Sequence, residues 1–165
     1  MPSHIAQLIR QGKPFENAEQ EVYLALLRLS SELTGQFAEL FRDAGLSSAQ
    51  YNVLRILRGA GDAALTCGEI GDRLVTRDPD VTRLLDRLER QGHVARSRER
   101  EDRRVVTTRI TAAGLDVLAS LDAPVAELHR RQLGHLGAER LRALLDLLAA
   151  AAEATAVAAP AVAAP

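Results

Sequence analysis

The chain has 165 residues, of which 47% are hydrophobic and 26% charged, and its formal net charge is −1. These values are close to globular averages and argue against wholesale disorder. No apolar run reaches the ~18 residues that a membrane span needs, and the N-terminus lacks a signal-peptide pattern, so we expect a soluble cytoplasmic protein. The single cysteine, Cys67, excludes an internal disulfide and a thiolate zinc cluster.

The N-terminal part of the chain is predicted to be helical. Gly12 and Pro14 limit residues 1–15 to a short helix and a connector. Residues 16–44 lack proline and carry apolar residues at spacings of three and four, which predicts one long helix that ends at Gly45. Because this helix is apolar on more than one side, we expect it to be buried between elements or between subunits.

Two shorter helices are predicted to follow. Ser47 or Ser48 can cap the first of them, and the glycine-containing stretch 59–62 then indicates a turn. Thr66 and Glu69 have the spacing of a capping box, which predicts the start of the second helix.

The next helix is predicted over Pro79–Arg90, with Asp78 as its N-cap and Pro79 in its first position. Its apolar residues recur with helical spacing on one side, and its polar residues, including Thr82 and Arg83, occupy the other side. A helix of this kind can be anchored by one face while the other face reads DNA bases.

Two β-strands are predicted over residues 94–98 and 105–110, as a hairpin around a charged turn. The segment from His93 to Arg109 contains six arginines and three acidic residues, so its charge of +3 contrasts with −4 for the remaining chain. The local field, rather than the total charge, attracts a phosphate backbone.

The C-terminal part is again predicted to be helical. A long helical stretch begins after Thr111, and Pro124 is expected to kink it or break it locally. A last helix is predicted from about Ala138, and the residues from about Ala154 onward are expected to fray because of their alanine, valine and proline composition.

The helix, turn, helix and arginine-rich hairpin together form the pattern of a winged helix-turn-helix. Three stretches are the most distinctive, namely DVTRLLDRLERQG over residues 80–92, EDRRVV over 101–106 and ITAAG over 110–114. With these stretches, residues 46–118 resemble the MarR family of winged-helix transcriptional regulators. The resemblance implies a mainly α fold, with a two-stranded wing and with long N- and C-terminal dimerisation helices.

This resemblance divides the chain into four parts. Residues 1–45 would hold the N-terminal dimerisation helices, and residues 46–110 the winged helix-turn-helix lobe that binds DNA. Residues 111–153 would hold the C-terminal dimerisation helices, and residues 154–165 an Ala/Pro-rich tail. We therefore expect a homodimer that binds a pseudo-palindromic duplex, with one recognition helix in each half-site.

The resemblance also implies which residues contact double-stranded DNA. In the wing, Asp102 would orient Arg104, while Arg103 or Arg104 enters the minor groove. For Arg87 and Arg90 a solvated helix face is the simpler interpretation. The candidate DNA-binding residues are Arg77, Asp80, Thr82, Arg83, Arg87, Arg98, Arg100, Asp102, Arg103 and Arg104.

Members of this family commonly bind small aromatic acids or other lipophilic anions between the dimerisation helices and the DNA-binding lobe. The resemblance therefore implies a possible effector of this kind, and the candidate ligand-binding residues are Tyr23, Arg28, Tyr51 and Arg55. With only two tyrosines and three phenylalanines in the chain, such a pocket would be mainly aliphatic.

Several functions stay open at this point. The main hypothesis is a sequence-specific regulator, most simply a repressor that a ligand releases, although the direction of regulation depends on where the operator lies. The alternative is a winged-helix module that binds a protein and not DNA, which the arginine-rich turn disfavours. Cys67 at a helix start could act as a redox switch. No metal, cofactor or catalytic motif is recognisable, so we expect no enzyme and no cofactor.

Overall fold

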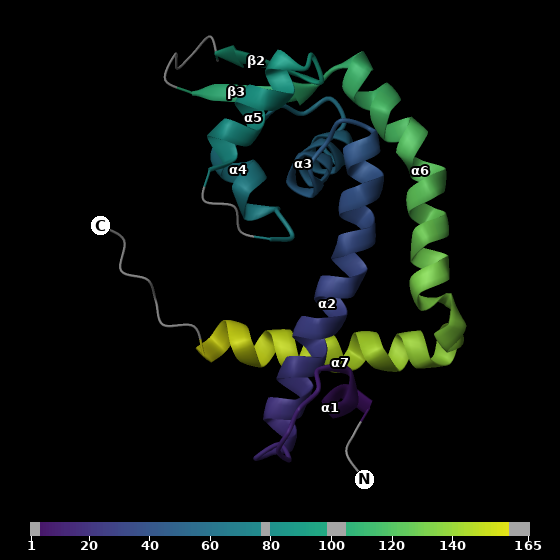
Figure 1. Cartoon of the computed structure of the whole chain (residues 1–165). Coiled ribbons are helices and arrows are strands. Elements are labelled where there is room, and N and C mark those ends of the chain that lie inside the picture. Colours follow the sequence, from purple (N-terminus) through teal and green to yellow (C-terminus); the bar gives the residue numbers. More distant parts are fainter. Residues whose placement is uncertain (1–3, 77–79, 99–104, 159–165) are drawn as a thin grey trace. The chain divides into compact units, whose positions relative to one another are not determined.

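The computed structural model of the chain describes residues 4–76, 80–98 and 105–158. It divides into two compact units, Met1–Pro124 and Val125–Pro165 (Figure 1). The first unit contains the winged lobe and the N-terminal helices, and the second contains the C-terminal helix.

The N-terminal helices of the first unit are α1, His4–Leu8, and α2, Ala18–Asp43, which pack against each other. The predicted long helix is confirmed, and it begins at residue 18 because the Asn17 side chain accepts a hydrogen bond of 2.8 Å from the backbone N–H of Gln20. It ends where Gly45 adopts a φ of +73°, a conformation that glycine reaches without steric cost.

Three short helices form the centre of the lobe: α3, Ser48–Gly59, α4, Cys67–Asp72, and α5, Val81–Arg90. Ser47 caps α3, and the Gln50 side-chain oxygen accepts a hydrogen bond from the Ser47 backbone N–H. The predicted capping box of Thr66 and Glu69 at the start of α4 is confirmed, with both reciprocal hydrogen bonds present.

The predicted start of α5 is wrong by two residues. The helix begins at Val81, and Asp80 is its N-cap, with a carboxylate oxygen that accepts a hydrogen bond of 3.0 Å from the Arg83 backbone. The sequence has one aspartate before Pro79 and one after it. It predicts the first as the N-cap because proline suits the first turn of a helix. The expected cap Asp78 and the expected first residue Pro79 lie outside the described residues.

The hairpin consists of β2, Val94–Arg98, and β3, Val106–Ile110, which pair antiparallel with Val94 opposite Ile110 and Arg98 opposite Val106. A third strand, β1, Leu65–Thr66, pairs with β3 on its other edge, so the sheet order is β1-β3-β2. The expected two-stranded wing thus lacks β1, whose two residues are too few to produce an alternating sequence pattern.

The core of the lobe lies where α3, α4 and α5 pack against one another and against the sheet. Its most deeply buried side chains include Leu54, Ile70 and Leu88, each fully enclosed. Burial of each such side chain stabilises the fold by about 1.5–3 kcal/mol. Gly114 marks a close contact at the base of the hairpin, because a Cβ at this position would lie 2.3 Å from the carbonyl oxygen of His93.

The C-terminal helices are α6, Ala112–Leu133, and α7, Gly137–Ala158, joined by the 3₁₀ turn η1, Gly134–Leu136. Helix α6 continues through Pro124, so the expected local break is absent. A proline inside a helix removes one backbone donor and crowds the preceding turn, but α6 stays helical on both sides of Pro124. Helix α7 extends beyond Ala154, where fraying was expected, because alanine has the highest helix propensity.

No helix within residues 4–76, 80–98 and 105–158 is long and apolar enough to cross a membrane.

Candidate nucleic-acid interface

Helix α5 is anchored by one side and exposed on the other. Leu84, Leu85 and Leu88 are 8%, 2% and 0% exposed and face the core. Thr82 and Arg83 are exposed on the opposite side, and the Arg83 side chain keeps 72% of its accessible surface. The structure therefore presents the polar face of α5 to solvent, as a recognition helix requires.

The candidate Asp80 has a structural role at the start of this helix. Besides capping α5, its carboxylate lies 3.8 Å from the Nε atom of Arg83. Thr82 lies close to the preceding helix, with its hydroxyl 3.5 Å from the Sγ atom of the half-buried Cys67. A DNA contact by Asp80 or Thr82 stays a prediction, as does a redox role for Cys67.

Arg96, on β2, ties the hairpin to α5. Its Nη2 atom pairs with Asp86, and its Nε atom lies 3.1 Å from a carboxylate oxygen of Glu89. The Arg96 side chain is only 19% exposed. The sequence shows this arginine as part of the local charge but gives it no partner, because no local pattern shows which strand residue meets which helix residue.

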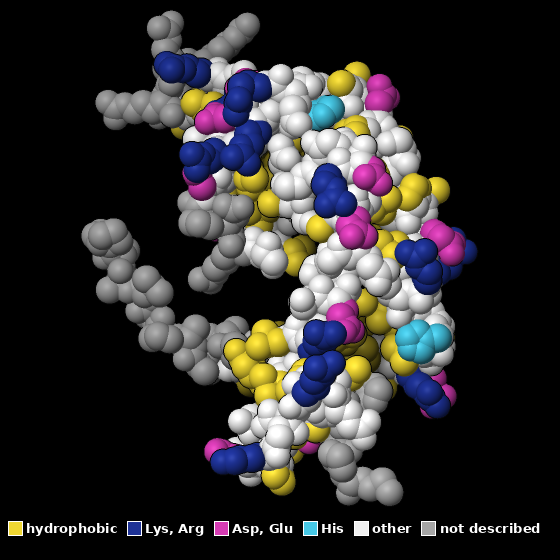
Figure 2. Space-filling view, in the orientation of Figure 1, with side chains coloured by type: hydrophobic (Ala, Val, Ile, Leu, Met, Phe, Trp, Pro, Cys, Tyr) yellow, Lys and Arg dark blue, Asp and Glu magenta, His cyan; other side chains and the backbone are white. Residues whose placement is uncertain are grey.

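Of the wing candidates, Arg98 lies within the described residues. Arg98 is exposed at the end of β2, opposite Val106. Arginine side chains gather over α5 and the hairpin (Figure 2). The other wing candidates and the residue before α5 lie outside the described residues: Arg77, Arg100, Asp102, Arg103 and Arg104.

An open surface pocket of about 360 Å³ adjoins the C-terminal end of α5. It is lined by Gln50 of α3 and by Arg87, Arg90 and Gln91. The spacing of Arg87, Arg90 and Gln91 can be read from the sequence, but the contribution of Gln50 depends on how α3 packs. From the sequence alone, a solvated helix face is therefore the simpler interpretation of Arg87 and Arg90.

The candidate ligand residues fall into two separate groups. The ring of Tyr51 stacks on Phe41 with centroids 4.0 Å apart, and its hydroxyl accepts a hydrogen bond of 3.2 Å from Arg55. Tyr23 lies 18 residues before Phe41 on α2, about 27 Å along the helix axis. Arg28, also on α2, pairs with Glu32 at 2.7 Å. Within one chain the structure thus brings Tyr51 and Arg55 together, and it does not bring Tyr23 to them.

Two carboxyl groups have lowered pKa values for different reasons. The guanidinium of Arg58 donates two hydrogen bonds of 2.8 Å to Asp122, which lowers the pKa of this carboxyl and joins α3 to α6. The backbone N–H of Thr66 lowers the pKa of Glu69 in the capping box. Neither group lies on the exposed face of α5, so both are structural.

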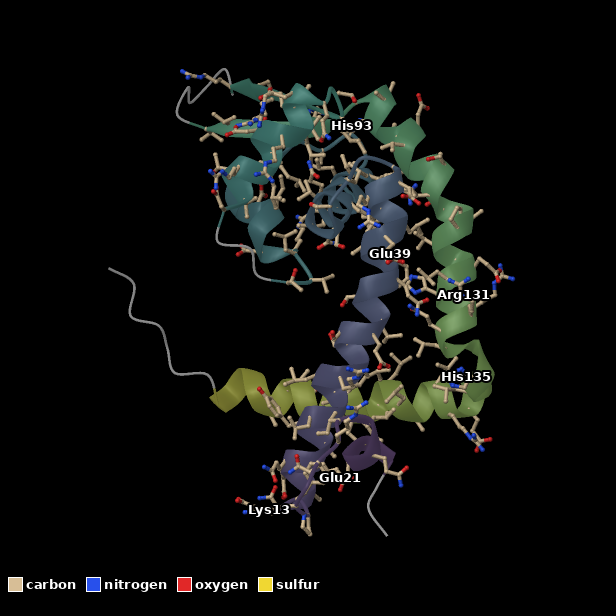
Figure 3. The ribbon with its side chains drawn as sticks, in the orientation of Figure 1. Lys13, Glu21, Glu39, His93, Arg131 and His135 are labelled. Carbon is tan, nitrogen blue, oxygen red and sulfur yellow. The ribbon has the colours of Figure 1, made fainter. Side chains whose placement is uncertain are left out.

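His93 lies where the hairpin meets the start of α6 (Figure 3). Its backbone carbonyl accepts a hydrogen bond of 3.0 Å from Thr111. Its Nδ1 atom is buried without a hydrogen-bond partner among the described residues. Among residues 4–76, 80–98 and 105–158, no group of three His, Cys, Asp or Glu side chains lies close enough together to bind a metal ion.

Comparison with known proteins gives a consistent result. A family model described as MarR family matches residues 44–105. The transcriptional regulator FarR of Neisseria gonorrhoeae, of the HTH type, is 26% identical over 82% of this chain and 92% of its own length.

Two solved structures are also similar to this chain. The crystal structure of a MarR transcription factor from Planctomyces limnophilus is 42% identical, covers 81% of this chain and 97% of its own, and has a TM-score of 0.65. The PcaV transcriptional regulator of Streptomyces coelicolor, solved in complex with its natural ligand, is 25% identical over 77% of this chain and 91% of its own, with a TM-score of 0.64.

Proposed function

Because the chain belongs to the MarR family of transcriptional regulators, whose members are not enzymes, we propose that it is a DNA-binding repressor. It binds a pseudo-palindromic operator as a homodimer, and a small anionic ligand releases it. One observation carries this proposal. Three buried leucines anchor α5, and its other face exposes Thr82 and Arg83 beside the positively charged hairpin.

The helix-turn-helix supports sequence-specific binding. Helix α4 packs against α5, and the sheet packs against both, so the exposed face of α5 is held in a fixed orientation. Arginine can donate two hydrogen bonds to guanine, and threonine contacts the thymine methyl group or a phosphate. Arg83 and Thr82 are thus the proposed base-contacting residues. The proposed wing contacts are Arg98, Arg100, Asp102, Arg103 and Arg104.

The homodimer is supported by apolar side chains that a single chain leaves exposed. On α2 they are Val22, Tyr23, Leu26, Leu27 and Leu29, which are 40–61% exposed. On α7 they are Leu145, Leu147 and Leu148, which are 40–70% exposed. A second copy that covers these faces would remove a large apolar surface from water. It would also supply a second α5 for the second half-site.

The effector site is proposed at Tyr51 and Arg55, where a cation and an aromatic hydroxyl meet beside Phe41. The ligand-bound PcaV structure is a precedent within the same fold. Such a ligand can release DNA only if it binds the DNA-incompetent arrangement better than the competent one.

The experiment that tests this function is selection from a random duplex library at two salt concentrations. We expect enrichment of an inverted repeat whose half-sites lie about one helical turn apart. Binding that shows no enrichment and disappears as salt rises would mean that the arginines contact only the backbone. Absence of binding at both concentrations would favour the alternative, a winged-helix module that binds protein.

A further inference from the structure

The pocket at the C-terminal end of α5 has the chemistry of an oxyanion site. We propose that it binds a backbone phosphate of the bound duplex, at the edge of the major groove that α5 enters. This inference rests on the proposed DNA binding and assigns it a contact that involves Gln50, Arg87, Arg90 and Gln91.

Two guanidinium groups supply the positive charge of the pocket. The Arg87 side chain forms no hydrogen bond or ion pair with any residue in the described ranges. Arg90 uses its Nε atom to donate to the Asp86 carbonyl at 3.3 Å, which leaves its terminal nitrogens for a ligand. A planar guanidinium suits phosphate oxygens because it can donate two parallel hydrogen bonds.

The two glutamine side chains add further hydrogen-bond donors to the pocket. Gln50 is 6% exposed, and its Oε1 atom accepts from the Ser47 backbone at 2.9 Å, while its Nε2 atom donates to Gln91 Oε1 at 3.0 Å. Gln91 in turn donates to the Gly45 carbonyl at 3.1 Å. Each amide oxygen accepts one of these hydrogen bonds, and each NH₂ group keeps a second hydrogen. Together with the two guanidinium groups, these NH₂ groups make the pocket rich in donors, which suits a ligand that accepts hydrogen bonds.

The negative charges of α5 are directed away from this pocket. Arg96 holds Asp86 and Glu89 on the side of α5 that faces β2. The last carbonyls of the helix are also engaged, because Leu88 accepts from the His93 N–H and Glu89 from the Gly92 N–H, both at 2.9 Å. The two arginines therefore dominate the field in the pocket.

The position of the pocket along α5 fits the dimensions of DNA. Arg83, Arg87 and Arg90 are spaced by four and three residues, so they lie along one side of the helix. Arg83 and Arg90 are about 10 Å apart along the axis, similar to the ~12 Å width of the major groove. When the first turn of α5 contacts bases, its last turn reaches the sugar-phosphate backbone.

The test is a methylphosphonate scan of the operator obtained by selection, in which single phosphates are made neutral. For the wild-type dimer, we expect one position in each half-site to lower affinity about tenfold. The double variant Arg87→Gln with Arg90→Gln should lose this sensitivity at that position, and the slope of log K against log salt should decrease in magnitude by about one for each half-site. Arg131→Gln, an exposed arginine of α6, is the matched control and should change neither quantity.

Two results would overturn the inference while the proposed function stands. In one, the wild type binds its operator and the double variant, with an unchanged melting temperature, keeps the wild-type methylphosphonate profile and salt slope. In the other, inorganic phosphate raises the melting temperature of the wild type but not of the double variant, while DNA binding is the same for both; the pocket then binds a free anion. If the wild type binds no duplex, the proposed function itself fails, and the inference fails with it.

Discussion

Arg96 is the residue that joins the wing to the recognition helix. Its replacement by alanine removes two ion pairs and leaves Asp86 and Glu89 without a partner near the DNA. We expect Arg96→Ala to lower the free energy of unfolding by about 1 kcal/mol. We also expect it to lower operator affinity on the order of tenfold, because two uncompensated acids face the phosphates.

The matched control for this variant is Arg98→Ala on the same strand. Arg98 is exposed and forms no ion pair with a described residue, so its replacement should reduce the salt dependence of binding without changing stability. Urea unfolding and DNA titration separate the two effects. Equal stability of the Arg96→Ala variant and the wild type would show that the wing does not depend on this pair.

Asp122 should contribute to stability in a pH-dependent way. Hydrogen bonds from Arg58 hold its pKa below the ordinary value for aspartate, which is about 3.9. The contribution is therefore fully present above about pH 4 and is lost as pH falls through the lower folded-state pKa. The difference in urea midpoint between wild type and Asp122→Asn should shrink below about pH 4.

At the scale of elements, local signals predicted most of the fold. The long helix α2, the capping box of α4 and the hairpin β2–β3 are all specified by residues within a few positions of one another. Strand β1 was missed because its two residues become a strand only through pairing with β3, more than 40 residues later in the chain. The sequence pattern likewise does not distinguish Asp78 from Asp80 as the N-cap, because both aspartates adjoin Pro79 and both can cap a helix.

The candidate site was less predictable than the fold, for the same reason. The exposed positions of α5 follow from its helical period, and Thr82 and Arg83 were identified in this way. The pairing of Arg96 with Asp86 and the contact of Gln50 with Gln91 join residues of different elements. A single sequence holds no signal for such pairs, because they depend on how the elements pack.

Two helical glycines should respond in opposite directions to replacement by alanine. Gly114→Ala places a Cβ 2.3 Å from the His93 carbonyl, so we expect a loss of at least about 2 kcal/mol and a displaced hairpin. A Cβ at Gly35 in α2 would have open space around it, with nothing within 4 Å in the described structure. Gly35→Ala should therefore stabilise the protein by about 0.5–1 kcal/mol. Thermal unfolding of both variants checks the prediction, and a loss of stability in Gly35→Ala would contradict it.

At the scale of the whole molecule, the apolar faces of α2 and α7 predict self-association. Sedimentation at micromolar concentration should give a species of about twice the 17.9 kDa chain mass. Leu26→Glu with Leu29→Glu should shift the distribution toward the monomer, because two charges would enter the proposed interface. Exposed Glu32→Gln is the control and should leave the dimer intact. A wild-type species of single-chain mass would contradict the dimer.

The central claim is that two α5 helices of one dimer read two half-sites of a duplex. The most direct measurement is a hydroxyl-radical footprint of the protein on the operator obtained by selection. We predict two protected segments related by two-fold symmetry and centred about one helical turn, or 10 base pairs, apart. Protection of both segments should decrease together in the Arg83→Ala variant. A single protected segment, or protection that is uniform along the duplex, would contradict the account.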